Sequence, residues 1–382
     1  MKLAPKRRFP VWPFRRSVQL LVVVALFAFP VIARYNHYLA ARQLDKQIER
    51  WEGSTQGLVL QVTDAALRVG IPDGESGVPT RRPRRAILER SRGFHGSPWS
   101  AEVGGVSLTD PLAATESACA SWAAPWVLIS GLLLPLALTV LLGRVFCGWI
   151  CPMGLLFDLS AWVRSLLPKL LEIKPLDLRF SRGTKYLLLA VGLALALLTG
   201  DAVLNTFYPP AILGREAHSF VFALFDRAED GMPGLALVGV TGGTAFLLLL
   251  MGLEVAVAPR FWCRTVCPGG ALYSLLGRWR LVRVRRKRDV CIDCTICDKV
   301  CPQGELPMTD RTVSECDNCG ECIDACPVRA LGYRIAVTSK PMTGRPLPVA
   351  TSATVATVAP LTPEGVSLAG AEPAELPEGG AS

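Results

Sequence analysis

The sequence has few histidines, and all three (His37, His95 and His218) fall outside its long apolar stretches. A b-type haem inside a membrane needs axial imidazoles on membrane-spanning helices, so we expect no haem of that kind. The chain also lacks the Cys-x2-Cys-His pattern of covalently bound haem, a Gly-rich dinucleotide loop and a phosphate-binding Gly-Lys-Ser/Thr pattern. These absences argue against a haem protein of this type and predict that the chain does not bind NAD(P)H.

Charge is also scarce, because only 19% of residues are charged and 51% are hydrophobic. Four stretches carry no charged residue: 17–33, 124–143, 186–200 and 234–253. Each approaches the length of about 20 residues that crosses about 30 Å of hydrocarbon. We therefore predict four transmembrane helices. The first resembles a signal peptide, but a helix-like segment at 35–51 continues from it, so we expect an uncleaved anchor.

Basic residues predict the orientation of these helices. They concentrate in the leader at 1–16, between the second and third stretches, and after the fourth. Such segments stay in the cytoplasm, so both termini are predicted to lie there. Residues 34–121 form a periplasmic loop too long for its arginines to govern topology. Orientation accounts for the net charge of +9, and we infer no binding of nucleic acid from it.

Cysteine, by contrast, is abundant: the chain has 13. The pattern Cys-x2-Cys-x2-Cys-x3-Cys-Pro occurs twice, from Cys291 and from Cys316. This spacing is typical of two [4Fe-4S] clusters in which the fourth cysteine of each run serves the other cluster. A structural zinc site usually has two well-separated ligand pairs, which makes it the weaker alternative. The predicted ligand sets are Cys291, Cys294, Cys297 and Cys326 for one cluster, and Cys316, Cys319, Cys322 and Cys301 for the other.

A second pattern, Cys-x3-Cys-Pro, follows the second and the fourth apolar stretch. Its cysteines are Cys147 and Cys151 in the first copy, and Cys263 and Cys267 in the second. A parallel duplication with a pseudo-twofold axis would bring the four thiols together at the cytoplasmic surface. Three uses are open: a further cluster, a dithiol-disulfide couple, or a quinone pocket. The alternative is that Cys-Pro only shapes a helix end. Cys119 alone would lie outside.

Weak candidates exist for a quinol site. Arg215, Glu216 and His218 follow the helix-breaking segment at 208–210 in the loop between the third and fourth apolar stretches. Glu254 lies at the inner end of the fourth stretch, where an ionisable residue close to hydrocarbon suggests function. Ordinary capping explains the first three about as well, and Glu254 alternatively extends to the interface.

Several segments together resemble the NapH/MauN family of ferredoxin-type membrane proteins. They are LTDPL at 108–112, FCGWICP at 146–152, residues 158–164, Gly214-Arg215, residues 262–277 and the double cysteine motif. The resemblance implies a subunit that takes electrons from membrane quinol towards periplasmic reductases, nitrate reductase being the best known. The expected partner is a periplasmic ferredoxin-like protein or multihaem cytochrome. The MauN side of the family implies an alternative, namely assembly of a periplasmic enzyme such as an amine dehydrogenase.

The predicted fold is an α-helical integral membrane protein with an internal two-fold repeat and a C-terminal α+β ferredoxin-like domain. Its parts are the leader 1–16, the first transmembrane helix 17–33, the periplasmic loop 34–121, the membrane domain 122–280, the ferredoxin-like domain 281–338, and a disordered tail 339–382. Within the loop, residues 36–100 look like an insertion, for which we expect a helix and consider a short strand at 58–62. The predicted clusters are cytoplasmic and the expected acceptors periplasmic. Either a partner protein carries the electrons across the membrane, or the electrons flow in a different direction.

Overall fold

The computed structural model describes residues 10–68, 94, 96–103, 106–122, 126–170, 172, 178, 180–229, 241–309 and 315–335. These all belong to one compact unit, Met1–Ser339. The predicted tail and the Arg/Pro/Gly-rich run within the insertion, residues 70–92, lie outside the described residues.

Helix α1 (Val11–Ala41) is 31 residues long and contains the first apolar stretch. It ends where Arg42 adopts a left-handed conformation, and α2 (Leu44–Arg50) and α3 (Thr55–Arg68) follow. The expected helical continuation is therefore confirmed. The prediction of a strand at 58–62 is wrong, because these residues belong to α3. Leu60 and Leu67 share a helical face, and Leu60 packs with Tyr38 and Phe225 in a buried cluster.

Three shorter apolar helices follow: α6 (Trp126–Leu142), α8 (Thr184–Thr199) and α11 (Gly242–Ala256). Among the described residues, α1 alone is long and apolar enough to cross a membrane by itself. The shorter helices nevertheless expose large apolar side chains, including Leu133, Leu198 and Leu249. Large exposed apolar patches are rare on proteins surrounded by water.

The two Cys-x3-Cys-Pro motifs have the same local structure. Each begins in one turn of π-helix, η1 (Phe146–Ile150) or η2 (Trp262–Val266). The amide of the second cysteine then donates to the carbonyl of the first π-helical residue, at 2.8 Å in both copies. Helices α7 (Met153–Leu170) and α12 (Pro268–Leu276) continue from the motifs, and η3 (Gly277–Trp279) ends the second copy. Single π-helical turns often mark functional sites.

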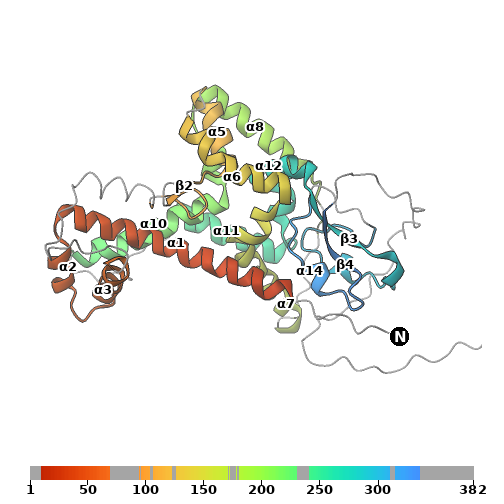
Figure 1. Ribbon diagram of the computed structural model, residues 1–382, viewed down its shortest axis with the longest axis horizontal. Coiled ribbons are helices and arrows are strands. Elements are labelled where there is room, and N and C mark those ends of the chain that lie inside the picture. Colours follow the sequence, from red (N-terminus) through yellow and green to blue (C-terminus); the bar gives the residue numbers. More distant parts are fainter. Residues whose placement is uncertain are drawn as a thin grey trace, which may run out of the picture. The chain divides into compact units, whose positions relative to one another are not determined.

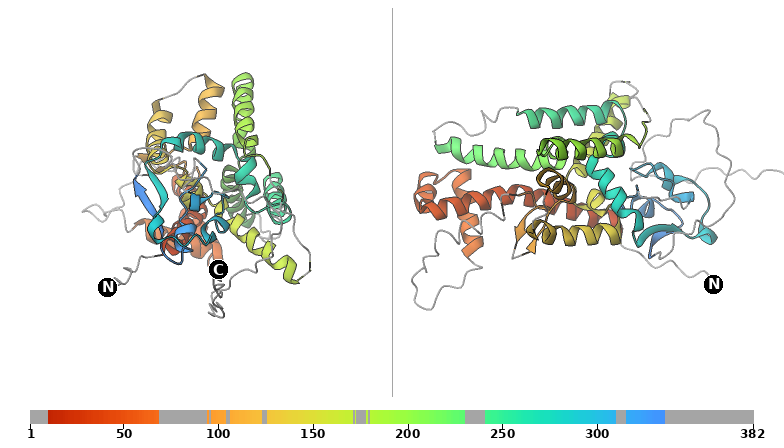
Figure 2. Two further views of the ribbon diagram at one scale, coloured as in Figure 1. Left: turned by 90° about the vertical axis from the view of Figure 1, so that its right-hand side faces the viewer. Right: turned by 90° about the horizontal axis from the view of Figure 1, so that it is seen from above.

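The segment between α8 and α10 folds back on the helices instead of forming a separate outer loop. After α9 (Leu204–Phe207), Tyr208 is buried and packs beside Gly269, where a side chain would meet its ring at 2.8 Å. Helix α10 (Pro209–Glu229) then runs beside α1 (Figures 1 and 2). Tyr208, which the sequence placed in the outer loop, thus contacts the second cysteine motif.

Asp110 lies at the start of α5 (Pro111–Ser121), after the short antiparallel pair β1 (Glu102–Val103) and β2 (Val106–Ser107). Pro135 has no amide hydrogen, so it leaves the Gly131 carbonyl of α6 without its helical donor. The Thr109 amide donates to that carbonyl at 3.1 Å. This bond holds the LTDPL segment against α6.

The C-terminal module, residues 282–335, consists of β3 (Val282–Arg286), η4 (Arg288–Val290), α13 (Ile296–Lys299), η5 (Pro307–Thr309), α14 (Glu321–Asp324) and β4 (Leu331–Ile335). The strands pair antiparallel, with Val284 opposite Tyr333. Val284, Met308 and Leu331 form its small apolar core together with several cysteines. A core this small suits a module held together by metal-thiolate bonds.

Candidate metal centres and thiol pocket

One cavity of the C-terminal module, with about 330 Å³ of empty space, is lined by four cysteines. They are Cys291, Cys294, Cys297 and Cys326. Three come from one loop and the fourth from the other half of the module, in the combination that the sequence predicted for the first cluster. We call these four the distal cysteines.

The other four, Cys301, Cys316, Cys319 and Cys322, are the proximal cysteines. Cys316, Cys319 and Cys322 are buried. Burial raises the pKa of Cys322, and the nearby thiols of Cys316 and Cys301 raise it further. Cys316 and Cys301 therefore lie within electrostatic reach of Cys322 although they come from both halves of the module, and so does Cys297 of the distal cysteines. Cys316 and Cys322 also belong to the apolar core of the module, and the assignment of the proximal cysteines to one cluster stays a prediction.

The backbone of both ligand loops suits an anionic cluster. Asp293 and Thr295 in the first loop, and Asn318 and Gly320 in the second, have positive φ angles between 51° and 85°. Where right-handed and left-handed backbone conformations alternate, successive amide N–H groups point inwards and form a concave site for an anion. The amides of Glu305 and Ala330 also donate to the sulfurs of Cys301 and Cys326, at 3.3 and 3.2 Å. Such bonds stabilise thiolates and tune cluster potentials.

Buried cations from the helices reach the proximal loops. Arg144 donates to the carbonyl and carboxylate of Glu315, Arg280 donates to the Cys316 carbonyl at 2.7 Å, and Lys185 pairs with Glu315. Arg144, Arg280 and Lys185 are each 1% exposed or less. Buried cations need nearby negative charge, and a tetrathiolate cluster would provide more of it. The donor set and its surroundings therefore fit [4Fe-4S] clusters.

Among the described residues, no group of three or more His, Cys, Asp or Glu side chains is close enough for a single metal ion. A cubane spreads four thiolates around four irons, so it needs wider separations than a single zinc ion does.

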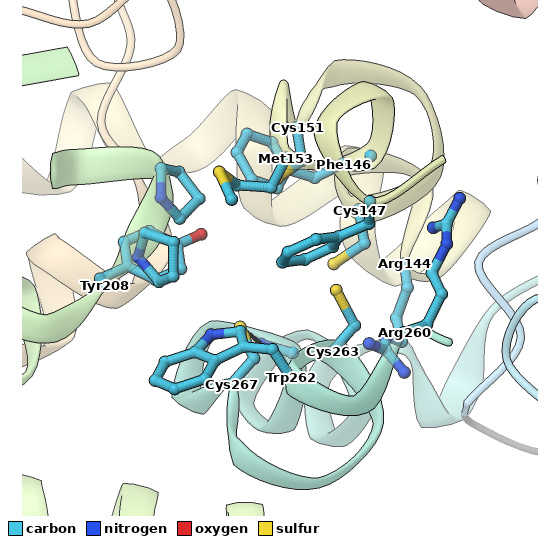
Figure 3. Close-up of a pocket in the computed structure, with 15 residues that line it drawn as sticks. Arg144, Phe146, Cys147, Cys151, Met153, Tyr208, Arg260, Trp262, Cys263 and Cys267 are labelled. Atoms are coloured by element: carbon cyan, nitrogen blue, oxygen red, sulfur yellow. Dashed lines mark hydrogen bonds between the residues drawn. The ribbon is translucent and has the colours of Figure 1, made fainter. Parts of the chain in front are cut away.

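The four remaining motif cysteines meet in one cavity, the thiol pocket, with about 430 Å³ of empty space. Cys147, Cys151, Cys263 and Cys267 approach it from the two facing π-helical segments (Figure 3). Arg144 and Arg260 lie on one side, and Tyr208 lies on the other. The convergence expected from the paired motifs is present in the structure.

The pocket favours neutral thiols. Burial raises the pKa of Cys267 to about 11 and that of Cys263 well above its ordinary value. Burial also raises the pKa of Cys147, although Arg144 opposes the rise. A bound metal would have to displace these protons, since thiolates are the ligands.

Both motifs contact the proximal loops through their three-residue spacers. Trp149 in the first spacer donates to the Asn318 carbonyl at 3.0 Å, and Arg264 in the second donates to the Pro302 carbonyl at 2.7 Å. Gly148 lies so close that a side chain would meet the Asp317 carbonyl at 2.7 Å. The thiol pocket is thus adjacent to the proximal cysteines.

The sequence-predicted quinol candidates fall into separate places. Arg215 and His218 line a polar cavity, and Arg215 also donates to the Asn205 and Thr206 carbonyls at the end of α9. Glu216 accepts hydrogen bonds from Thr241 and Thr244 at the start of α11. Glu254 is buried and caps η2 by accepting from the amides of Phe261 and Trp262. The Glu254 carboxylate therefore acts as a helix cap in this structure.

Asp110 and Tyr273, for which the sequence predicted no role, occupy central positions. Asp110 is 4% exposed and accepts hydrogen bonds from the Leu112 amide and from Tyr273, whose hydroxyl lies 3.3 Å away. Sequence reasoning noted both residues only as parts of family motifs. The available signal was Asp-Pro before an apolar helix, which indicates an N-cap and no further role.

Comparisons with known proteins agree with this arrangement. One model described as a 4Fe-4S binding domain matches residues 124–173 and 235–288, which contain the two Cys-x3-Cys-Pro motifs. A second model with the same description matches residues 312–332. No solved structure matches the chain.

Three curated relatives are similar to more than half of this chain. The ferredoxin-type protein NapH of Haemophilus influenzae is 31% identical, over 60% of this chain and 75% of its own length. NapH of Escherichia coli is 29% identical, over 58% and 72%. The methylamine utilization ferredoxin-type protein MauN of Paracoccus denitrificans is 33% identical, over 53% and 64%. The chain is thus an iron-sulfur electron-transfer protein and belongs to the NapH/MauN family of ferredoxin-type proteins.

Proposed function

We propose that this protein takes electrons from membrane quinol and passes them through its iron-sulfur clusters to a partner protein that serves a periplasmic reductase. The observation that carries this proposal is the contact of the thiol pocket with the proximal loops. Both Cys-x3-Cys-Pro spacers hydrogen-bond to the loops of the proximal cysteines. Electrons entering at the thiol pocket therefore have a short route to two successive clusters.

The proposed ligands are the distal cysteines for one [4Fe-4S] cluster and the proximal cysteines for the other. The cavity lined by Cys291, Cys294, Cys297 and Cys326 supports the crossed assignment. We assign a third [4Fe-4S] cluster to Cys147, Cys151, Cys263 and Cys267. The 4Fe-4S binding domain model that spans both motifs, and the convergence of their thiols, support this assignment.

The proposed membrane domain has four spans, formed by α1, α6, α8 and α11. Exposed leucines on the three short helices support it, because lipid tails would cover them. At 1.5 Å per residue the 17 residues of α6 span about 25 Å, close to the roughly 30 Å of hydrocarbon. The start of α1 hydrogen-bonds Asp324 of the C-terminal module. The start of α1 and the clusters therefore share one side, for which basic flanking residues favour the cytoplasm.

Iron content and quinol-driven reduction together test this proposal. Full-length protein purified anaerobically should contain about 12 iron atoms, and Cys147→Ser or Cys263→Ser should lower that number to about 8. The same variants should keep ferredoxin-type EPR signals with dithionite but lose reduction by quinol. Cys119→Ser is the matched control, since Cys119 lies on α5 outside the thiol pocket. Unchanged iron and unchanged quinol reduction in the pocket variants would refute the third cluster and the route.

A further inference from the structure

A largely apolar cavity lies between α6 and the first cysteine motif, with about 700 Å³ of empty space. Leu134, Pro135 and Leu138 of α6 form one wall. Leu134 and Leu138 are 49% and 40% exposed, so this wall faces the surface that the proposed bilayer would cover. Pockets for small molecules usually have apolar walls with a few polar groups.

The polar end of this apolar cavity is formed by Asp110 and Tyr273. Tyr273 donates to one carboxylate oxygen of Asp110, and Tyr208 provides a second hydroxyl bond. Burial raises the pKa of Asp110 to about 6, against these bonds and the Leu112 amide. A carboxylate with such a pKa is well suited to accept a proton near neutral pH.

Asp110 also borders a second, polar cavity, with about 990 Å³ of empty space. Arg215, His218 and Ser97 line it, and Gly214 has no side chain, so Ser97 can approach closely. Asp110 and Trp99 line both cavities. A proton accepted by Asp110 from the apolar side therefore has an exit into a polar space large enough for water.

Aromatic contacts connect the apolar cavity to the thiol pocket. Tyr273 stacks on Phe146 with ring centroids 5.0 Å apart and an interplanar angle of 20°. Phe146 lines both the apolar cavity and the thiol pocket, and it precedes Cys147 in the chain. Electrons from a molecule bound in the apolar cavity would thus leave towards the thiol pocket, whereas its protons would leave through Asp110 to the polar cavity.

We infer that the apolar cavity binds the headgroup of a membrane quinol and that Asp110 is the base that receives its protons. This inference rests on the proposed function and names the substrate site within it. Both O–H bonds of the quinol break, and the product is quinone. The two electrons reduce iron-sulfur clusters in one-electron steps through the thiol pocket, and the two protons pass successively through Asp110 to the polar cavity. The isoprenoid tail lies along Leu134 and Leu138.

Photolabelling locates the site without depending on turnover. Full-length protein in lipid nanodiscs would be irradiated with an azido-ubiquinone and mapped by mass spectrometry. Label should appear on residues 98–111 or 134–150. Leu134→Trp narrows the opening and should lower labelling at least tenfold, whereas Leu133→Trp should not, because Leu133 is exposed on α6 outside the cavity lining. Labelling confined to other segments, or equal loss in both variants, would overturn the assignment.

The role of Asp110 is tested by stopped-flow reduction of the clusters with decylubiquinol. Asp110→Asn should slow reduction at least tenfold while dithionite still reduces the clusters fully, because Asn keeps the N-cap of α5. Glu116→Gln, another buried carboxylate of α5 that caps α9, is the matched control and should retain the rate. Equal rates in Asp110→Asn and the wild type would overturn the role of Asp110.

The pH profile separates a base from a structural residue. Deprotonated Asp110 is the active form, so the wild-type rate should rise about tenfold per pH unit below pH 6 and level off above it. Asp110 faces Tyr273, Tyr208 and the Leu112 amide, with Arg215 and His218 lining the same polar cavity. The inflection should persist in His218→Gln and vanish in Asp110→Asn; the reverse would overturn the inference. If quinol does not reduce the wild-type clusters, the proposed function fails. Photolabelling alone then tests whether the apolar cavity binds a quinone.

Discussion

Arg144 connects the thiol pocket to the C-terminal module at the level of single residues. It lines the pocket and pairs with the Glu315 carboxylate at 2.6 Å, where burial opposes ionisation but Arg144 and Lys185 hold the pKa of Glu315 below its ordinary value. Arg144→Gln would leave this carboxylate with less compensation and should destabilise the protein by about 3–5 kcal/mol. Thermal unfolding in detergent checks this. The exposed Arg288→Gln should change stability by less than about 0.5 kcal/mol. Equal melting temperatures for the two variants would contradict the account of Arg144.

Crossed ligation gives a second prediction at the residue scale. Cys326→Ser should remove the cluster of Cys291, Cys294 and Cys297, and Cys301→Ser should remove the cluster of Cys316, Cys319 and Cys322. Each variant should lose about four iron atoms and a different EPR signal. Sequential ligation would be indicated instead if Cys326→Ser and Cys322→Ser lost the same signal.

Individual residues differ in how well sequence predicts them. The cysteine sets follow from spacing alone, because a cubane dictates which intervals a tight loop can use. Asp110 could not be found that way. Its importance comes from Tyr273, 163 positions away, and from two cavities, one that needs α6 and one that needs α10 to pack beside the start of α5. Glu254 was suspected because of its depth, but its carboxylate caps η2.

At the scale of elements, the π-helical turn η1 positions the first cysteine motif against the second ligand loop of the C-terminal module. A Cβ atom on Gly148 would lie 2.7 Å from the Asp317 carbonyl, so Gly148→Ala should force the loop away. We predict faster tryptic release of the module and a lower melting temperature. In α11, Gly252 has open space around its Cβ position, so Gly252→Ala should leave stability unchanged or raise it by up to about 1 kcal/mol. Indistinguishable digestion of the two variants would contradict this account of η1.

Elements with strong periodicity were predicted well, and irregular ones were not. The long apolar helix α1 and its continuation follow from composition, whereas the strand expected at 58–62 is part of α3. Tertiary contact with Tyr38 and Phe225 decides that segment, since its β-branched residues alone suit either state. The return of Leu204 and Tyr208 towards the second motif depends on Gly192, which leaves space for the Leu204 side chain.

At the scale of the whole molecule, the proposed topology places the end of α5 that carries Cys119 and the clusters on opposite sides of the membrane. Cys119, on α5, should react with a membrane-impermeant maleimide added to spheroplasts, and Cys119→Ser should abolish that labelling. A fluorescent protein fused after Ser382 should fluoresce, because it stays in the cytoplasm. The proposed orientation would be contradicted if Cys119 were labelled only after lysis, or if the fusion protein were present at normal abundance without fluorescence.

Electron transfer from quinol to the clusters is the central claim, and EPR of the anaerobic protein in nanodiscs tests it most directly. Spectra would be recorded before and after adding decylubiquinol, with dithionite defining full reduction. The account predicts cluster signals on quinol addition, which disappear when Cys147 is replaced by serine. Signals that arise only with dithionite in the wild type would contradict it, because electrons would then have to enter from the cytoplasm.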